Sequence, residues 1–335
     1  MKAIRLHQIG GVQNLRVDEV ENTMAAAGEV LVRIDAAALN HRDIYITQGL
    51  YPGIALPAIL GSDGAGTVAA LGDGLDGPPV GTPVVINPML DWGDDPQVWG
   101  PKATILGMPR PGTFAQFVSV PRENVAPTPR GLSPAEAAAV PLGGLTAYRA
   151  TFTRGRVSAR DTVLITGVGG GVQTFVLLFC KRIGAKVVAT SSSDEKLGRA
   201  RALGADETFN YRSDGEWYKS ARKIGIDVAI DSAGGETLAR AIDIVKPGGR
   251  IVTYGGTNGD AKIRPFSIFW NQKDVLGTSM GSPQDFAAML ELFEQGLRPA
   301  VDRIFEMDEI VAAAERLEHA DQFGKIVLRV AEVSS

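Results

Sequence analysis

The sequence has few metal-binding and redox side chains for its length. Its 335 residues include one cysteine, Cys180, and three histidines. A single cysteine excludes an internal disulfide and any zinc site built from several cysteines. Because Cys180 ends the apolar run FVLLFC, we expect it to be a buried structural residue.

The chain also lacks an excess of charge of one sign and any long hydrophobic run. Lys and Arg total 34 against 38 Asp and Glu, a formal net charge of −4, which argues against a nucleic-acid partner. Its apolar stretches are much shorter than the ~18 residues of a membrane span. The start, MKAIRLHQIG, lacks the apolar core of a signal peptide. We therefore expect a cytoplasmic protein without a membrane partner.

Glycine, in contrast, is abundant, and the chain changes texture along its length. It has 40 glycines with no low-complexity tract to hold them, so they are expected in turns and at close backbone approaches. Up to residue 124, short apolar or alternating runs separated by Gly, Pro and Asp predict strands. Residues 88–113 contain five prolines and little periodicity, and they are expected to form a long functional or interface loop.

From residue 133 the pattern is one of alternating helices and strands. Ser133, followed by Pro134 and Glu136, is a typical helix start. Strands and helices spaced in this way predict an α/β fold with a doubly wound parallel sheet. The expected strands are 161–166, 186–190, 206–210, 225–231 and 248–256, and the expected helices are 172–183, 194–203 and 236–245.

A glycine-rich turn links the first of these strands to the first helix. Gly167, Gly169, Gly170 and Gly171 leave the backbone bare where a dinucleotide pyrophosphate can approach the positive end of a helix. A strict G-x-G-x-x-G would have glycine at 172, where this chain has Val172. A tight strand–helix turn is the plainer alternative, but the alternating context favours dinucleotide binding.

The end of the next strand indicates which dinucleotide binds. An NAD site normally has Asp or Glu there to bind the ribose 2′-hydroxyl. Here the strand is followed by Ser191, Ser192 and Ser193, and the first acid is Asp194. Hydroxyl groups without a carboxylate suit a 2′-phosphate, and Lys196 adds a cation. NADPH is therefore the expected cofactor, although these residues also suit a simple helix cap.

At this point the sequence resembles the medium-chain dehydrogenase/reductase superfamily over essentially its whole length. Within it, the chain looks most like the zinc-independent quinone oxidoreductases, whose pattern is matched by Asn40, Asp43, Tyr45, Gly49, Tyr51 and Pro52. The other segments that carry the resemblance are LGSDGAGTV at 60–68, GLTAYRA at 144–150, the glycine turn, TSSSDEKLGRARALGAD at 190–206, NYR at 210–212 and GKIVL at 324–328.

The resemblance implies two domains with a cleft that holds the nicotinamide. A β-rich GroES-like catalytic domain covers 1–124 and is completed by 283–335, and a Rossmann NADP-binding domain covers 125–282. It also implies that Thr146 lies near the nicotinamide and that Lys325 lies near the cofactor phosphates. Ser192, Lys196 and Tyr211 are implied around the 2′-phosphate. Gln173 departs from the glycine that relatives often have at the end of the turn.

The resemblance further implies chemistry without zinc. Where zinc relatives have an early cysteine, this chain has Asn40, and their G-H-E segment reads Gly61-Ser62-Asp63. A catalytic zinc needs three protein ligands, and this chain lacks the cysteine and the histidine among them. Asn40 and Tyr51 are the expected hydrogen-bond donors to the substrate oxygen, with Tyr45 lining the pocket. The alternative is that both tyrosines only wall the pocket.

These observations predict an NADPH-dependent enzyme that transfers hydride to a quinone, an enone or a related activated double bond or carbonyl of a small molecule. An enoyl-thioester reductase, an alcohol dehydrogenase-like enzyme and a non-catalytic NADPH-binding protein stay open as alternatives. The segment at 273–281 resembles the last Rossmann strand of this family, which pairs with its two-fold mate. A homodimer is therefore expected, and a homotetramer is possible.

Overall fold

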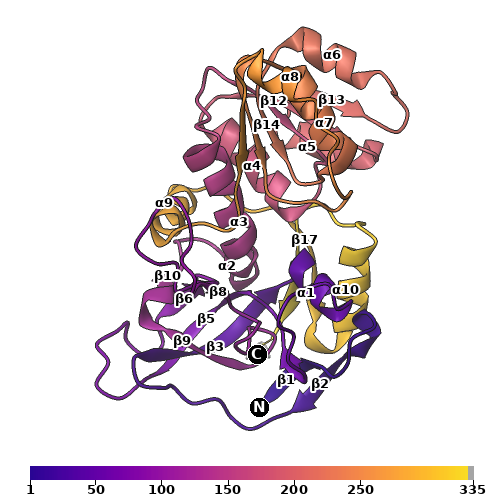
Figure 1. Ribbon diagram of the computed structural model, residues 1–335. Coiled ribbons are helices and arrows are strands. Elements are labelled where there is room, and N and C mark those ends of the chain that lie inside the picture. Colours follow the sequence, from indigo (N-terminus) through magenta and orange to yellow (C-terminus); the bar gives the residue numbers. More distant parts are fainter. Residues whose placement is uncertain (331–335) are drawn as a thin grey trace. The chain divides into compact units, whose positions relative to one another are not determined.

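The computed structural model describes residues 1–330, and these form two compact units (Figure 1). Unit 1 consists of Met1–Gly143 together with the chain from Ser282 onward, and unit 2 is Gly144–Gly281. The first boundary lies between Gly143 and Gly144, later than the expected 124/125. The reason is that residues 125–143 contact unit 1. The strand at 125–127 pairs with the strand at 83–86, and the helix at 134–139 packs on the central strands of unit 1.

Unit 1 is built on one large, mainly antiparallel sheet with the strand order β10-β6-β5-β3-β18-β17, and β9 also pairs with β3. The long strands β3 and β5 form its centre, and inward side chains of β3 such as Val32 and Ile34 join a large apolar core that also includes Phe114, which precedes β9. The strands are β3 (Glu29–Ala38), β5 (Asp63–Leu71), β6 (Pro83–Ile86), β9 (Phe117–Pro121), β10 (Val125–Pro127), β17 (Val301–Glu306) and β18 (Lys325–Arg329).

Smaller elements complete unit 1. Its further strands are β1 (Lys2–Leu6), β2 (Leu15–Glu19), β4 (Ala58–Ile59), β7 (Met89–Leu90) and β8 (Thr104–Ile105). Its helices are α1 (His41–Thr47), α2 (Pro134–Ala139), α9 (Pro283–Glu294) and α10 (Ile310–Glu318), with 3-10 turns at 12–14, 122–124 and 307–309. The excursion 88–113 is thus mostly irregular, as expected, apart from the short β7–β8 pair.

Unit 2 has the doubly wound parallel sheet that the sequence predicts. Its strand order is β13-β12-β11-β14-β15-β16, with every pair parallel. The crossover at β11 separates two halves, and a ligand of such a sheet binds where the order reverses. The strands are β11 (Thr162–Ile165), β12 (Lys186–Ser191), β13 (Glu207–Asn210), β14 (Ile226–Asp231), β15 (Val245–Thr253) and β16 (Asp274–Gly277).

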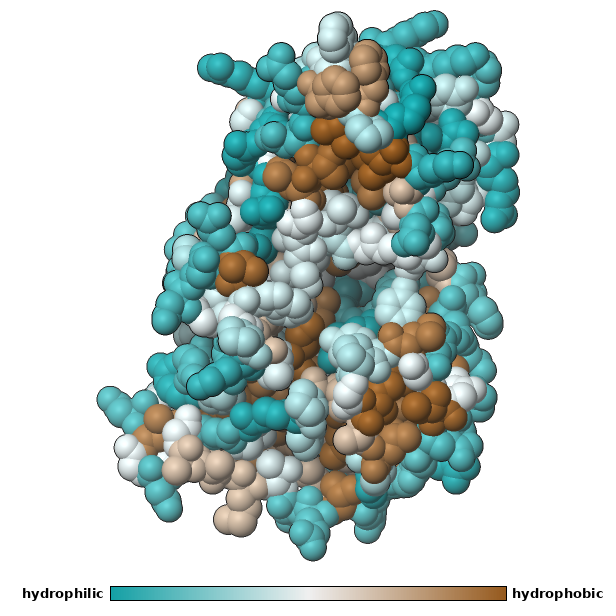
Figure 2. Space-filling model, viewed as in Figure 1, coloured by the Kyte–Doolittle hydropathy of each residue, from teal (hydrophilic) through white to brown (hydrophobic). Residues whose placement is uncertain are grey.

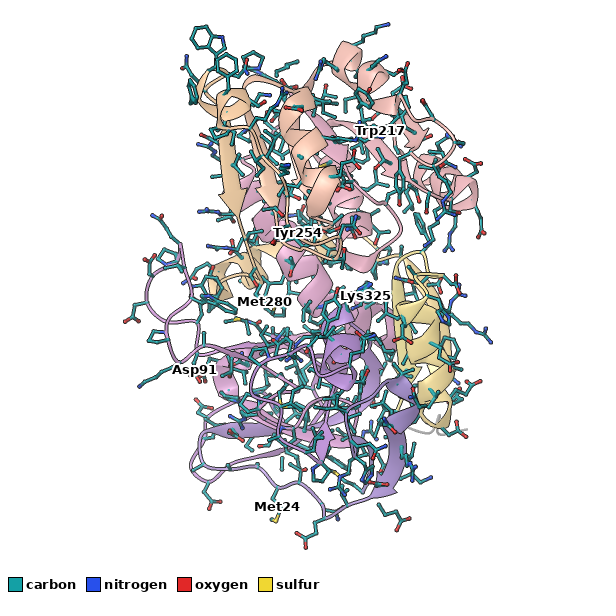
Figure 3. The ribbon with its side chains drawn as sticks, turned by 45° about the vertical axis from the view of Figure 1, so that its right-hand side comes forward. Met24, Asp91, Trp217, Tyr254, Met280 and Lys325 are labelled. Carbon is teal, nitrogen blue, oxygen red and sulfur yellow. The ribbon has the colours of Figure 1, made fainter. Side chains whose placement is uncertain are left out.

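Helices flank this sheet and complete its core (Figure 1). They are α4 (Gly171–Arg182), α5 (Asp194–Ala202), α6 (Trp217–Ile224), α7 (Gly235–Ile244) and α8 (Pro265–Phe269), while α3 (Pro141–Tyr148) and the π-helical turn at 149–154 lead into the unit. Trp217 of α6, labelled in Figure 3, packs with Leu164 and Val188 of the central strands. No helix within residues 1–330 is both long and apolar enough to span a membrane.

Candidate functional site

In unit 1 the candidate site begins at the N-terminus of α1. Asn40 is the N-cap in an extended conformation, and its backbone N–H donates to Asp43 Oδ2 over 2.8 Å. The other Asp43 oxygen accepts from the N–H of Gly61 at 3.3 Å. Burial raises the pKa of the Asp43 carboxyl, although the nearby Arg42 charge opposes this. Asp43 therefore holds the start of α1 against Gly61, between β4 and β5, which is a structural role.

The Asn40 side chain lies in a buried polar cluster with Asp63 and Lys325, which is labelled in Figure 3. Asn40 Nδ2 donates to Asp63 Oδ2 at 2.9 Å, and Lys325 Nζ donates to Asn40 Oδ1 at 2.6 Å. Because lysine only donates and a carboxylate only accepts, these partners fix which atom of the amide is oxygen. One N–H of Asn40 is left over for another acceptor.

Lys325 and Asp63 form an ion pair that is almost completely buried. Lys325 Nζ lies 2.8 Å from Asp63 Oδ2 and also donates to Leu39 O at 2.7 Å, while Asp63 Oδ1 accepts from the N–H of Leu142. With Asn40 Oδ1, all three N–H groups of the ammonium have acceptors inside unit 1. A phosphate contact by Lys325, as the resemblance implies, would require one of these three bonds to be exchanged.

Arg42 fills the space beside Ser62, the residue that replaces the histidine of zinc relatives. Arg42 Nη1 donates to Ser62 Oγ at 2.7 Å and to Leu106 O at 2.9 Å, and Ser62 Oγ donates to the same carbonyl. The guanidinium carbon lies 4.9 Å from the centre of the Tyr51 ring, a cation–π arrangement. The Arg42 guanidinium thus places a positive charge next to the position where zinc relatives have their histidine.

The two candidate tyrosines lie on and just after α1. Tyr45 is half-buried on the helix, its ring 6.5 Å from that of His41, and burial raises the pKa of its phenol. Tyr51 is half-buried against the core of unit 1 beside Arg42. Asn40, Tyr45 and Tyr51 therefore belong to one stretch of unit 1, as the sequence pattern predicts.

The donor residues of unit 1 do not fit a zinc ion. No group of three or more His, Cys, Asp or Glu side chains suited to a metal occurs among residues 1–330. Ser62 and Asp63 are already bonded to Arg42 and Lys325. Cys180, on α4 of unit 2, is buried, and burial raises its pKa to about 12, so its thiolate form is disfavoured.

In unit 2 the glycine turn between β11 and α4 is shaped for close backbone approach. Gly167 and Gly169 have φ of 69° and 131°, in the region that favours glycine. A Cβ on Gly169 would lie 2.8 Å from Lys196 Cδ, so the lysine stem lies over the turn. The N–H groups of Gly167 and Val168 donate to Thr190 Oγ1 and Thr190 O, which fixes the turn to β12.

The turn leads directly into the N-terminus of α4, whose N-cap is Gly170 and which has no side-chain cap. The first N–H groups of such a helix, here from Gly171 and Val172 onward, are suited to an anion such as a pyrophosphate. Gln173 is buried and donates from Nε2 to Ser232 Oγ after β14. The departure from glycine at 173 thus ties α4 to the neighbouring strand, and a dinucleotide fits the bare turn before it.

The carboxyl end of β12 holds the residues expected around a 2′-phosphate. Ser191 accepts from the N–H of Ser193 through Oγ and from the N–H of Tyr211 through its carbonyl oxygen. Ser193 is the α5 cap, because its Oγ accepts from the N–H of Lys196. This bonding brings Ser192, Lys196 and the exposed Tyr211 to the same edge of the sheet.

No carboxylate ends β12 itself. Asp194, the first acid after the strand, accepts from Asn210 Nδ2 at 2.8 Å and is bound to the end of β13. Thr146, the remaining expected residue, is buried on α3 in unit 2. The polar residues at this edge are therefore mainly hydroxyl donors with one lysine.

Comparison with known proteins decides the family. Residues 26–130 match the alcohol dehydrogenase GroES-like domain, and residues 171–295 match the family described as zinc-binding dehydrogenase. The chain is 36% identical over 340 residues to a zinc-type alcohol dehydrogenase-like protein, YogA, of Leptosphaeria maculans, which covers 94% of each chain. The chain belongs to the medium-chain dehydrogenase/reductase superfamily.

Solved structures of this superfamily agree over the whole chain. A crystal structure of an NAD-dependent alcohol dehydrogenase has a TM-score of 0.93 and 36% identity, covering 99% of this chain and 100% of the other. A crotonyl-CoA carboxylase/reductase, AntE, in complex with NADP has a TM-score of 0.89 and 25% identity, covering 99% of this chain and 95% of the other. The superfamily member described here is accordingly an oxidoreductase with an NAD(P) cofactor and a small-molecule substrate.

Several residues of this site carry little or no local signal in the sequence. Asp63 stands out only as a departure from G-H-E, and its pairing with Lys325 across 262 positions leaves no local pattern. Arg42 could have been singled out, because it stands between Asn40 and Asp43 in the matched motif. The Gln173–Ser232 bond likewise joins residues whose proximity follows only from the sheet order.

Proposed function

We propose that this chain is an NADPH-dependent reductase that transfers hydride, without a metal, to the activated double bond or carbonyl of a quinone or enone. The observation that carries the proposal is the cluster of Asn40, Arg42, Ser62, Asp63 and Lys325. Asn40, Asp63 and Lys325 bond to one another, and Arg42 bonds to Ser62. Asn40 and the 61–63 segment stand at positions where zinc relatives have ligands. Hydrogen-bond donors held in place can take over the polarising role of a Lewis acid.

NADPH is proposed over NADH because of the hydroxyl-rich end of β12. A carboxylate there would repel a 2′-phosphate, and the first acid is bonded to Asn210 instead. Ser192, Lys196 and Tyr211 are proposed as its ligands, with Ser191 supporting the loop and Thr146 on the nicotinamide side. Gly167, Gly169, Gly170, Gly171 and Val172 are proposed to hold the pyrophosphate. Relatives include both NAD-dependent and NADP-bound proteins, so this preference needs its own test.

When bound, NADPH supplies the hydride, and negative charge develops on the substrate oxygen. We propose that the remaining N–H of Asn40 and the phenol of Tyr51 donate hydrogen bonds to that oxygen. Lys325 and Asp63 fix the Asn40 amide so that it presents N–H and not its oxygen. For an enone, hydride addition leaves an enolate, and Tyr51 or water supplies the proton that it needs. Tyr45 lines the pocket.

An enoyl-thioester reductase is the second candidate, and the likeness to a crotonyl-CoA carboxylase/reductase favours it. The names of relatives support an alcohol dehydrogenase-like enzyme. The absence of a metal-suited group of His, Cys, Asp or Glu among residues 1–330 does not favour a zinc-dependent one. The third alternative, a non-catalytic NADPH-binding protein, would not require the donor residues Asn40 and Tyr51, so their presence argues against it. We also propose a cytoplasmic protein that assembles as a homodimer or homotetramer.

A substrate screen tests the proposal. NADPH oxidation is followed with quinones, enones, aldehydes and enoyl thioesters at equal concentration, and elemental analysis measures zinc after dialysis. We expect turnover of quinones or enones and no stoichiometric zinc. Turnover confined to enoyl thioesters would favour the second candidate. About one zinc per chain, with activity lost to a chelator and restored by zinc, would exclude the metal-free reaction.

A further inference from the structure

Arg42 is a buried cation that its surroundings satisfy only in part. The residue is 8% exposed, and its Nη1 donates to Ser62 Oγ and Leu106 O. Nε and Nη2 are also buried and have no hydrogen-bond partner within residues 1–330. A guanidinium carries five N–H groups, so three remain without an acceptor. Buried polar groups in native proteins nearly always have partners, which points to a ligand or water at this edge.

The geometry of the unsatisfied edge limits the ligand. Nε–H and one N–H of Nη2 point in parallel from the planar guanidinium, an arrangement that matches the two oxygens of a carboxylate. The opposite edge is held by Ser62 and Leu106, so the orientation of the plane is fixed. A single neutral carbonyl oxygen would leave part of this pair unused.

No acid is directly bonded to Arg42 among the described residues, although Asp43 and Asp63 balance the charges of Arg42 and Lys325. Of the two buried acids nearby, Asp63 is paired with Lys325 at 2.8 Å. Asp43 accepts two backbone N–H groups, and its attraction to Arg42 acts at longer range without an ion pair among the described residues. The direct partners of Arg42 are a hydroxyl, a carbonyl oxygen and the Tyr51 ring, all neutral. What Arg42 lacks is therefore hydrogen-bond acceptors for Nε and Nη2, and a carboxylate would supply two of them on one group.

We propose that Nε and Nη2 of Arg42 bind a carboxylate of the substrate, so that the preferred substrates are enones that also carry an acid group. The turnover part of this proposal rests on the proposed function, whereas the binding part does not. Burial away from water strengthens such charge-assisted bonds.

Binding is tested with the full chain and a pair of unreactive probes, 4-oxopentanoate and its methyl ester, by isothermal titration calorimetry. Wild type should bind the acid about tenfold or more tightly than the ester. Arg42→Gln should remove that difference, and Arg42→Lys, which keeps the charge but not the paired donors, should reduce it. Arg33→Gln is the matched control, because Arg33 is half-exposed and paired with Asp35 elsewhere in unit 1.

Equal binding of acid and ester by wild type, or no binding of the acid, would mean that Arg42 holds only water, and the proposal would fail even if Arg42→Gln does not fold. A second arm measures NADPH oxidation with 4-oxopent-2-enoate and its methyl ester, where the acid should have the lower KM. Acid binding without any turnover would overturn the proposed function and leave this site standing. Equal binding and equal turnover of the acid and the ester would overturn the Arg42 site and leave the proposed function standing.

Discussion

Lys325 and Asp63 show how much one buried contact is expected to matter in this protein. Lys325→Met would leave the Asp63 carboxylate buried with its cation removed. Loss of one partner of a buried pair typically costs about 3–5 kcal/mol, so the free energy of unfolding should fall by about that amount. Urea denaturation followed by circular dichroism measures it.

The matched control for Lys325 lies on the same strand. Arg329 pairs with Glu306, and both side chains are about half-exposed. Arg329→Met should therefore change the free energy of unfolding by about 0–1 kcal/mol. The double variant Lys325→Met/Asp63→Asn should recover part of the loss, because the buried charge is then gone. A loss for Lys325→Met as small as that for Arg329→Met would contradict the role assigned to this pair.

Cofactor preference depends on residues at the carboxyl end of β12. We expect wild type to bind NADPH about tenfold or more tightly than NADH, because one charge-assisted hydrogen bond from Lys196 is worth about 1.5–3 kcal/mol. Lys196→Ala should reduce the preference, and Ser192→Asp should shift it toward NADH by repulsion of the 2′-phosphate. Fluorescence titration with both reduced cofactors measures this.

Lys186→Ala is the control for the cofactor variants, since Lys186 is exposed at the opposite end of β12. It should leave the ratio of the two dissociation constants unchanged. Equal affinities of wild type for NADPH and NADH would assign the serines to helix capping alone.

Local patterns predicted site residues, but not the contacts between distant ones. The serines after β12 and the glycines before α4 stand in short stretches whose chemistry can be read without the fold. The motif also predicted Asn40, Tyr45 and Tyr51. What fixes the Asn40 amide, however, is Lys325 on the last strand, 285 positions away. Only the pairing of β18 with β3 brings these residues together.

At the scale of elements, periodicity and start signals predicted most of unit 2. The expected helix 172–183 is α4 at Gly171–Arg182, and the expected strand 186–190 is β12 at Lys186–Ser191. Among the described residues, the helices α1, α3, α6, α8, α9 and α10 were not predicted, and α1 and α6 show why. α1 has only seven residues, most of them buried, and so lacks a polar face. α6 lies between turn residues and long polar side chains that resemble a loop in sequence.

The start of α2 was predicted from Ser133, Pro134 and Glu136, and the structure has a full capping box there. Glu136 N donates to Ser133 Oγ, and Glu136 Oε2 accepts from the N–H of Ser133. Ser133→Ala should lower the free energy of unfolding by about 1 kcal/mol, measured by urea denaturation, without changing NADPH affinity. Ser158→Ala, in a turn outside the helices, serves as the control and should have a smaller effect on stability. Equal losses would argue against the cap as the cause.

At the scale of the whole molecule, the boundary between the units illustrates the limit of texture in the sequence. The family resemblance implies that residues 125–143 belong to the Rossmann domain, and the alternating texture starts at 133, yet β10 pairs with β6 and α2 packs on β3 and β5. Long-range pairing assigns these residues to unit 1. Texture identified the two fold types but not the point at which the chain passes from one unit to the other.

Assembly is the property of the whole molecule that the edge of the unit 2 sheet bears on. Among the described residues β16 pairs only with β15, and Val275 on it is 38% exposed. Phe266 and Phe269 on the neighbouring α8 and Trp270 just after it are each more than half exposed, and Figure 2 shows apolar surface in this region. Exposed edge strands and apolar patches of this kind are usually covered by a partner.

We therefore expect at least a homodimer, with two-fold pairing of β16, and multi-angle light scattering should give twice the 35.4 kDa chain mass or more at micromolar concentration. Val275→Lys places a charge on the edge strand and should shift the population toward the monomer. Val17→Lys is the matched control, because Val17 is 37% exposed on β2 of unit 1 and should leave the mass unchanged. A wild-type mass of one chain would rule out the dimer, and an equal shift in both variants would rule out β16 as its interface.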